Sequence, residues 1–237
     1  MDWNNFKNRF HPSWHKVIKP FIESNECNKI YTFLKNQKGV EIAPKSALTF
    51  RAFEQSLKDV KCVVILDEPY SNKQNDLQYA DGIPLSCEFV DKIHPHLNAF
   101  YDAMEEEFYG LNLHAIKQMN LNFYTNQGVL FLSSSLTTEI GSPGKHKRLW
   151  VPFMKYLIKR VFSPKMIPII FCGESVYDQY AKVLDPIYPY FVVKQSLSDC
   201  PIGVPWSTNG VFTRLNKYLW DNTIYNEVMW VNMDVPY

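Results

Sequence analysis

The sequence predicts a single α/β domain whose central four-stranded parallel sheet is flanked by helices. Three observations lead to this fold class. Short, continuously apolar runs recur at wide intervals, helical patterns lie between them, and no low-complexity linker, charge block or internal repeat divides the 237 residues. Strands that are apolar at every position have both faces buried, which is typical of parallel sheets joined by right-handed crossovers.

The elements are predicted in chain order as follows. We expect a helical extension over residues 1–40, and then strands at the apolar runs 62–66, 129–132, 167–171 and 190–193. One helix is predicted from Leu97 to Phe108. A clearer helix repeats apolar residues at positions 150, 154, 157, 158 and 161, with basic residues on its outward side. Residues 220–237 are expected to form a C-terminal tail of the same domain.

Composition and charge exclude several classes of protein. The chain is 46% apolar, so it can bury a substantial core, and 25 basic against 24 acidic side chains leave a formal charge of +1. No global field favours nucleic acid or membrane, so any polyanion site must be local. The chain has no apolar run long enough to span a membrane, and its start lacks the apolar segment of a signal peptide. We therefore expect an intracellular protein, cytoplasmic or nucleoid-associated, with no membrane partner.

The sequence gives no reason to expect a cofactor. Its five cysteines are widely spaced and include no CxxC pair, which argues against a disulfide framework and a zinc site. His94, His96 and His114 also lack the spacing of metal ligands.

Polar residues follow each predicted strand. The first strand is followed by Asp67, Glu68 and Tyr70, and the other three by residues 133–137, 173–175 and 194–198. In open α/β sheets the ligand site lies beyond the carboxyl ends of the strands. These loops therefore predict a polar cleft suited to a sugar, a base or a phosphate. The alternative is that they are polar only because chains turn in water.

Several segments together resemble one enzyme family. Residues 43–70, APKSALTFRAFEQSLKDVKCVVILDEPY, closely resemble the stretch that leads into the catalytic loop of uracil-DNA glycosylases. Further matches follow in the family's order and spacing, at residues 80–86, 93–98, 127–133, 136–137, 145–150, 195–198 and 209–219. The resemblance covers roughly residues 40–220. It implies the family's four-stranded parallel sheet, DNA as a partner, and hydrolysis of the N-glycosidic bond of a base flipped out of the helix.

The resemblance also implies roles for individual residues. It puts Glu68, with Asp67 beside it, at the catalytic carboxylate, and it puts Val193, or Lys194 if the loop slips by one, at the histidine that stabilises the leaving base. The base pocket falls on Tyr70, Leu85 and Ser133. DNA contacts fall on His96, Lys145, His146, Lys147, Ser196, Leu197 and Ser198, with Leu197 as the wedge that fills the space left by the flipped nucleotide.

The chain departs from the family at the positions that read the base. Leu85 lacks the stacking face of the family's phenylalanine, and the hydroxyl of Ser133 cannot reproduce the paired donor and acceptor of an asparagine. Glu68 extends one methylene, about 1.5 Å, beyond the family's aspartate. Asp67 is either a replacement acid that positions water or a like-charge neighbour of Glu68.

Two functions remain open on the sequence. In the first, the chain is a divergent glycosylase for uracil or a modified pyrimidine. In the second, it is a catalytically inactive protein on the same fold that binds DNA or docks a partner in replication, transcription or repair. For single residues the ordinary readings also stand: a turn carboxylate for Glu68, a core aromatic for Tyr70, a surface leucine for Leu197, and a solvated helix start for residues 145–148. The many Asn, Lys, Tyr and Phe residues are compatible with a virus or phage origin.

Overall fold

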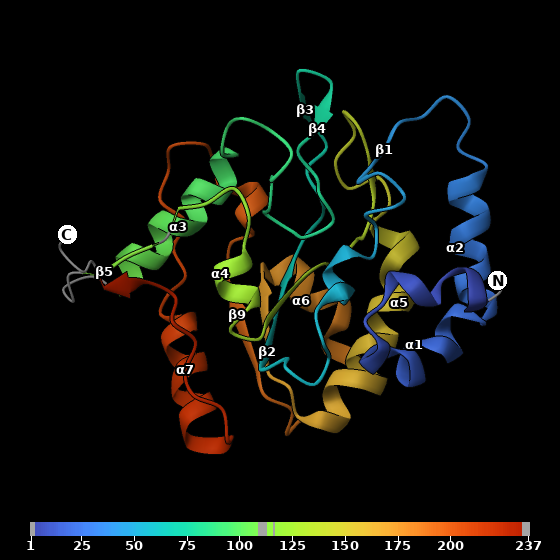
Figure 1. The fold of residues 1–237 in the computed structure, drawn as a ribbon. Coiled ribbons are helices and arrows are strands. Elements are labelled where there is room, and N and C mark those ends of the chain that lie inside the picture. The colour runs from blue at the N-terminus through green and yellow to red at the C-terminus, as the bar shows by residue number, and fades with distance from the viewer. Residues whose placement is uncertain (1–2, 109–112, 116, 234–237) are drawn as a thin grey trace.

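The computed structural model describes residues 3–108, 113–115 and 117–233, and it confirms the predicted α/β fold (Figure 1). All four predicted strands are present and parallel, in the order β6-β2-β8-β9. Their bounds are β2 Cys62–Leu66, β6 Val129–Ser133, β8 Ile169–Cys172 and β9 Tyr190–Val193. Because the strands are parallel, the loops that follow them all leave from one edge of the sheet.

Helices cover both faces of this sheet. The α-helices of the described residues are α1 His15–Ile22, α2 Asn25–Lys35, α3 Pro95–Glu107, α4 Asn122–Thr125, α5 Lys147–Leu157, α6 Glu174–Tyr180 and α7 Val211–Asn222. Figure 1 shows α1, α2 and α5 on one side of the sheet and α3 and α7 on the other. None of the described helices combines the length and the apolar character needed to cross a bilayer.

Short elements complete the chain. Pairs of two-residue antiparallel strands are β1 Ile42–Ala43 with β7 Thr138–Glu139, β3 Lys73–Gln74 with β4 Leu77–Gln78, and β5 Leu113–His114 with β10 Asn232–Met233. The 3-10 turns are η1 Trp3–Asn5, η2 Lys7–Arg9, η3 Pro12–Trp14, η4 Arg51–Glu54, η6 Ser163–Lys165, η7 Ala181–Val183 and η8 Leu197–Asp199. A π-helical turn, η5 Ile158–Phe162, extends α5.

The sheet divides the core into two parts, because successive side chains of a strand point to opposite faces. On β2, Val63 and Ile65 pack in the first part with residues of α1, α2 and α5. Val64 and Leu66 pack in the second part with residues of α3 and α7. Every residue of β2 is therefore buried, which explains the unbroken apolar run in the sequence.

Helix boundaries differ from the sequence prediction by a few residues. The predicted helix over 150–161 begins three residues earlier, at Lys147, and changes to the π turn after Leu157. α3 begins at Pro95, where the missing N–H of proline costs nothing, and the ring of His94 caps it by accepting the backbone N–H of His96. Within the predicted tail, residues 220–222 belong to α7, and residues 234–237 lie outside the described residues.

Replacing Phe153 with alanine should destabilise the fold strongly. Its ring is fully buried on α5, with its centroid 5.0 Å from that of Phe21 and 5.7 Å from that of Phe53. Loss of this aromatic packing should lower the free energy of unfolding by about 3–5 kcal/mol, measured by urea denaturation. The matched control is Ile224→Ala, because Ile224 is almost fully exposed and its loss should change little. Equal effects from the two variants would contradict this description of the core.

Candidate active site

A cleft of about 430 Å³ opens at the carboxyl edge of the sheet. Four segments that are distant in sequence line it: the loop after β2, the segment before α3, the start of α5 and the loop after β9. Their polar residues in the cleft are Asp67, Glu68, Tyr70, Ser71, Asn72, His94, His96, Lys147, Ser196, Ser198 and Asp199. The volume falls within the range of small-molecule sites, so the cleft can hold a nucleotide-sized group.

Asp67 ties the loop after β2 to the loop after β9. Its side chain is buried, and its Oδ2 accepts hydrogen bonds from the hydroxyls of Ser196 and Ser198, the second at 2.8 Å. Its Oδ1 lies 3.5 Å from Nζ of Lys147, and its backbone carbonyl accepts the N–H of Ser135 at 3.1 Å. Both carboxylate oxygens therefore have partners, which favours a structural role for Asp67.

Glu68 has far fewer partners than Asp67. Its side chain is 10% exposed, and among the described residues its Oε2 has no hydrogen-bond partner. The ammonium of Lys147 lies 3.5 Å from Oε2, a distance typical of an ion pair and too long for a strong hydrogen bond. Burial raises the pKa of Glu68 above its ordinary value, and the carboxylates of Asp67 and Asp199 add to this while Lys147 opposes it. A carboxylate with free lone pairs and a raised pKa is suited to accept a proton from water.

Lys147 is the cation shared by these two carboxylates. Burial opposes its charge, yet Asp67 and Glu68 raise the pKa of Lys147 above its ordinary value, so the ammonium stays protonated. Lys147 is the first residue of α5, and the start of this helix lies at the cleft. The sequence predicts a DNA contact for Lys147, and the structure places its ammonium 3.5 Å from a carboxylate oxygen of each acid.

Tyr70 is fixed by a hydrogen bond and by stacking. Its hydroxyl donates to the backbone carbonyl of Leu85 at 3.0 Å, and its ring stacks on His94 with centroids 3.7 Å apart. The ring of His96 lies 5.0 Å from that of His94. Burial, with His96 nearby, lowers the pKa of His94 to about 3, so the imidazole is neutral at physiological pH. The sequence indicated only that His94 lacks the spacing of a metal ligand, and it assigned the residue no role in the site.

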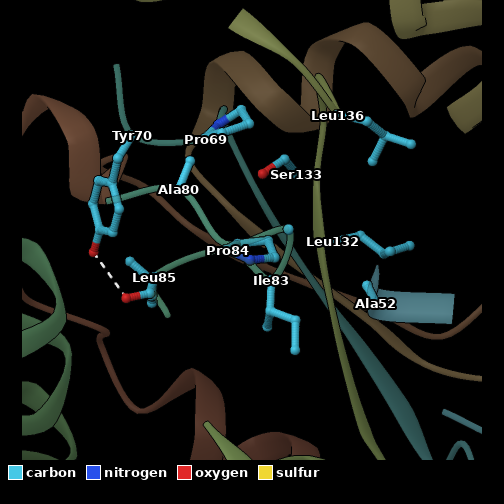
Figure 2. A pocket seen from close by; sticks show the side chains of 11 residues that line it. Ala52, Pro69, Tyr70, Ala80, Ile83, Pro84, Leu85, Leu132, Ser133 and Leu136 are labelled. Carbon is cyan, nitrogen blue, oxygen red and sulfur yellow. Dashed lines mark hydrogen bonds between the residues drawn. The ribbon is translucent and has the colours of Figure 1, made fainter. Parts of the chain in front are cut away.

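The residues of the predicted base pocket line a small hollow, and Figure 2 shows how their side chains lie. Tyr70, Leu85 and Ser133 surround a hollow of only about 10 Å³, which is room for about one water molecule. Apolar residues fill the rest of it, including Ala52, Ala80, Ile83, Leu132 and Leu136. Tyr70 and Leu85 also line the open cleft, whereas Ser133 lines only the hollow. The three predicted pocket residues therefore line one small hollow, whereas Glu68 lines the neighbouring cleft, to which Ser133 does not contribute.

The two candidates for the leaving-group position do not face Glu68. Val193 is the last residue of β9 and is fully buried in the second part of the core. Lys194 follows the end of β9 and is exposed. Neither residue lines the hollow or the cleft.

The predicted DNA contacts at the starts of α3 and α5 differ in how far they are exposed. Lys145 is exposed and His96 is half-buried at the cleft. His146 is buried, with Thr137 Oγ1 at 2.9 Å from its Nδ1 and Glu139 Oε1 at 3.5 Å from its Nε2. Thr137 Oγ1 also accepts the indole N–H of Trp150, so the hydroxyl links the two side chains. His146 is thus a structural residue that holds β7 against α5.

The loop after β9 contains three of the predicted DNA contacts, Ser196, Leu197 and Ser198. The hydroxyl of Ser196 is buried and donates to Asp67, so it is not free for a phosphate. Ser198 is exposed, although its hydroxyl also donates to Asp67. The side chain of Leu197 lines the cleft floor but is only 2% exposed, because it packs into the second part of the core.

Within the described part of the chain, no group of three or more His, Cys, Asp and Glu side chains is arranged to hold a metal ion. The side chain of His114 lies outside that part. In the cleft, Nζ of Lys147 lies 3.5 Å from both Oδ1 of Asp67 and Oε2 of Glu68, so the lysine neutralises part of the charge of the two carboxylates.

Comparison with known proteins identifies the family. No family model matches the chain. The uracil-DNA glycosylase of Psychromonas ingrahamii is 31% identical over 177 residues, which cover 73% of this chain and 79% of that protein. The chain belongs to the uracil-DNA glycosylase family. The uracil-DNA glycosylase of Borreliella burgdorferi is 29% identical over 218 residues, covering 90% of this chain and 92% of the relative.

The fold agrees with this membership. The crystal structure of mimivirus uracil-DNA glycosylase superimposes with a TM-score of 0.79 at 21% identity, over 95% of this chain and 89% of that one. The resemblance to uracil-DNA glycosylases seen in the sequence motifs is therefore confirmed. Leu85 and Ser133, the two positions where the sequence predicts departures from the family, both line the small hollow.

Glu68→Gln should make the stability of the protein less dependent on pH. Because the pKa of Glu68 is raised on folding, the folded chain keeps a proton that the unfolded chain releases once the pH exceeds the ordinary value. The stabilising contribution is present in full below that ordinary value and is lost as the pH rises through the raised pKa. The variant has no titrating group at this position. The difference in free energy of unfolding, variant minus unsubstituted protein, should therefore become more positive as the pH rises from about 4 to about 7. Urea denaturation at several pH values measures it, and a difference that stays constant or decreases would contradict the assignment.

Proposed function

We propose that this chain binds DNA and hydrolyses the N-glycosidic bond of uracil or a modified pyrimidine that has been flipped out of the helix. The observation that carries the proposal is the largely buried carboxylate of Glu68, which lines the open cleft and has the ammonium of Lys147 at 3.5 Å from its Oε2. Membership of the uracil-DNA glycosylase family supports it, because the relatives carry that name. We also propose that the protein works inside a cell, in the cytoplasm or at the nucleoid, or in the host of a virus or phage.

Glu68 would act at the sugar. The bond from C1′ to the base breaks with both electrons leaving on the base, and the sugar becomes oxocarbenium-like. The anion of Glu68 stabilises that positive charge and orients a water molecule, whose oxygen bonds to C1′. The proton that this water loses passes to Glu68 and then to the departed base. A raised pKa assists this step, because the carboxylate is a stronger proton acceptor than an ordinary glutamate.

The surroundings of Glu68 support this role. Lys147 keeps the second carboxylate, Asp67, from repelling Glu68 strongly, and the Asp67 tie to Ser196 and Ser198 fixes the two loops that form the cleft walls. The base itself would occupy the cleft beside Tyr70 and His96 and not the hollow at Ser133, because the hollow has room for only about one water molecule. We therefore expect the preferred base to differ from that of enzymes that read uracil with an asparagine.

A second function is favoured by the closed hollow. A family member that has lost its base-reading pocket can retain the fold and act as a DNA-binding factor, or dock a protein of replication, transcription or repair. In that case the cleft would bind DNA without turnover, and Glu68 would serve only to hold Lys147.

Glu68→Gln tests the proposed activity. The variant keeps the size of the side chain and removes the anion, so excision should fall at least about a hundredfold. Single-stranded and duplex oligonucleotides that contain uracil or modified pyrimidines are incubated with the protein, and alkali then converts abasic sites to strand breaks. The matched control is Glu174→Gln, which changes an exposed glutamate after β8 that does not line the cleft, and it should leave the rate unchanged.

The same assay separates the two functions. Cleavage that is lost in Glu68→Gln and kept in Glu174→Gln supports the glycosylase. If no oligonucleotide is cleaved at high protein concentration, and salt-dependent DNA binding is the same with and without the Glu68 substitution, the glycosylase is rejected in favour of the binding factor.

A further inference from the structure

The loop after β9 carries an exposed apolar residue at the cleft. Ile202 is 76% exposed, whereas Leu197, five residues earlier, is 2% exposed. Both side chains line the same cleft as Glu68. Single exposed apolar residues are common on protein surfaces, so exposure alone indicates nothing. Ile202 differs from other exposed apolar residues because it lines the cleft and lies in a loop that is held by hydrogen bonds.

A tight turn holds Ile202 in place. The N–H of Val204 donates to the carbonyl of Pro201 at 3.0 Å, and Gly203 has a φ of +84°. This is the geometry of a turn that requires glycine at its third position, and it puts Ile202 at the second, outermost position. Pro201 also restricts the chain that enters the turn, because its φ is fixed.

Buried residues anchor both ends of this turn. Cys200 is buried, and its N–H donates to the carbonyl of Leu197 at 3.2 Å. On the other side, Trp206 is buried and its indole N–H donates to the carbonyl of Gln195 at 2.9 Å. These contacts fix both ends of the turn, so the exposed side chain of Ile202 is held at the cleft.

We propose that Ile202, and not Leu197, is the wedge that enters the base stack of duplex DNA and fills the space left by the flipped nucleotide. This inference rests on the proposed action on DNA. A wedge needs only apolar bulk that can be desolvated between base pairs, and isoleucine provides it. Leu197 meets this need only by leaving the core in which it is packed, whereas Ile202 already faces outward beside the cleft.

The test compares serine substitutions at two exposed isoleucines. Ile202→Ser removes the wedge, and Ile187→Ser is the matched control. Ile187 is 79% exposed and lies before β9, so it is at the opposite edge of the sheet from the cleft. Excision is measured on one target base in a duplex and in a single strand, since only the duplex has a stack to enter. If the protein binds without turnover, a fluorescent base analogue beside the target reports flipping instead.

We expect Ile202→Ser to lower excision or flipping in the duplex about tenfold and to change the single-strand value less than about twofold, because a single strand leaves no gap to fill. Ile202→Leu should restore the duplex value, and Ile187→Ser should match the unsubstituted protein. Leu197→Ala should lower the urea midpoint while leaving the ratio of duplex to single-strand activity unchanged in the folded protein.

Contrary results distinguish the inference from the function on which it rests. If the protein acts on DNA and Ile202→Ser leaves the ratio of duplex to single-strand activity unchanged, the wedge assignment is wrong and the proposed function stands. A selective loss of duplex activity in folded Leu197→Ala would likewise return the wedge to Leu197. If the unsubstituted protein neither cleaves nor binds any of these DNAs, both proposals fail.

Discussion

The carboxylate pair at the end of β2 determines how the carboxyl edge of the sheet is built. Asp67 and Glu68 are adjacent and largely buried, and burying two negative charges is costly unless each is compensated. Asp67 receives two serine hydroxyls as well as Lys147, whereas Glu68 has Lys147 alone. The same cation therefore stabilises both acids, while the difference in hydrogen bonding leaves one acid structural and the other with free lone pairs in the cleft.

The open space at this edge of the sheet lies beside Glu68 and not at Ser133. Ser133 lines a hollow with room for about one water molecule, which Tyr70 and Leu85 also line. The larger cleft lies next to Glu68, between the loops that Asp67 ties together. The carboxylate pair therefore stands beside the space that can hold a nucleotide-sized group.

Much of the fold could be predicted from the sequence, because unbroken apolar runs mark strands that are buried on both faces, and all four of them became strands of the sheet. The motif order also identified the family. Side-chain pairing could not be predicted. Lys147 was expected to contact phosphate, but its direction depends on two acids 80 and 79 residues earlier in the chain. The burial of His146 and Leu197 depends on packing against β7 and the second part of the core, which no local pattern records. The exposure of Ile202 results from a turn that only the backbone geometry reveals.

The most direct test of the account is the structure of Glu68→Gln bound to a duplex that contains one uracil opposite guanine. The account predicts that the nucleotide is outside the helix with its base in the open cleft, that C1′ faces residue 68, and that the Asp67 hydrogen bonds to Ser196 and Ser198 are unchanged. A base that enters an opened hollow at Ser133, or a duplex bound elsewhere on the protein with all its bases paired, would contradict it.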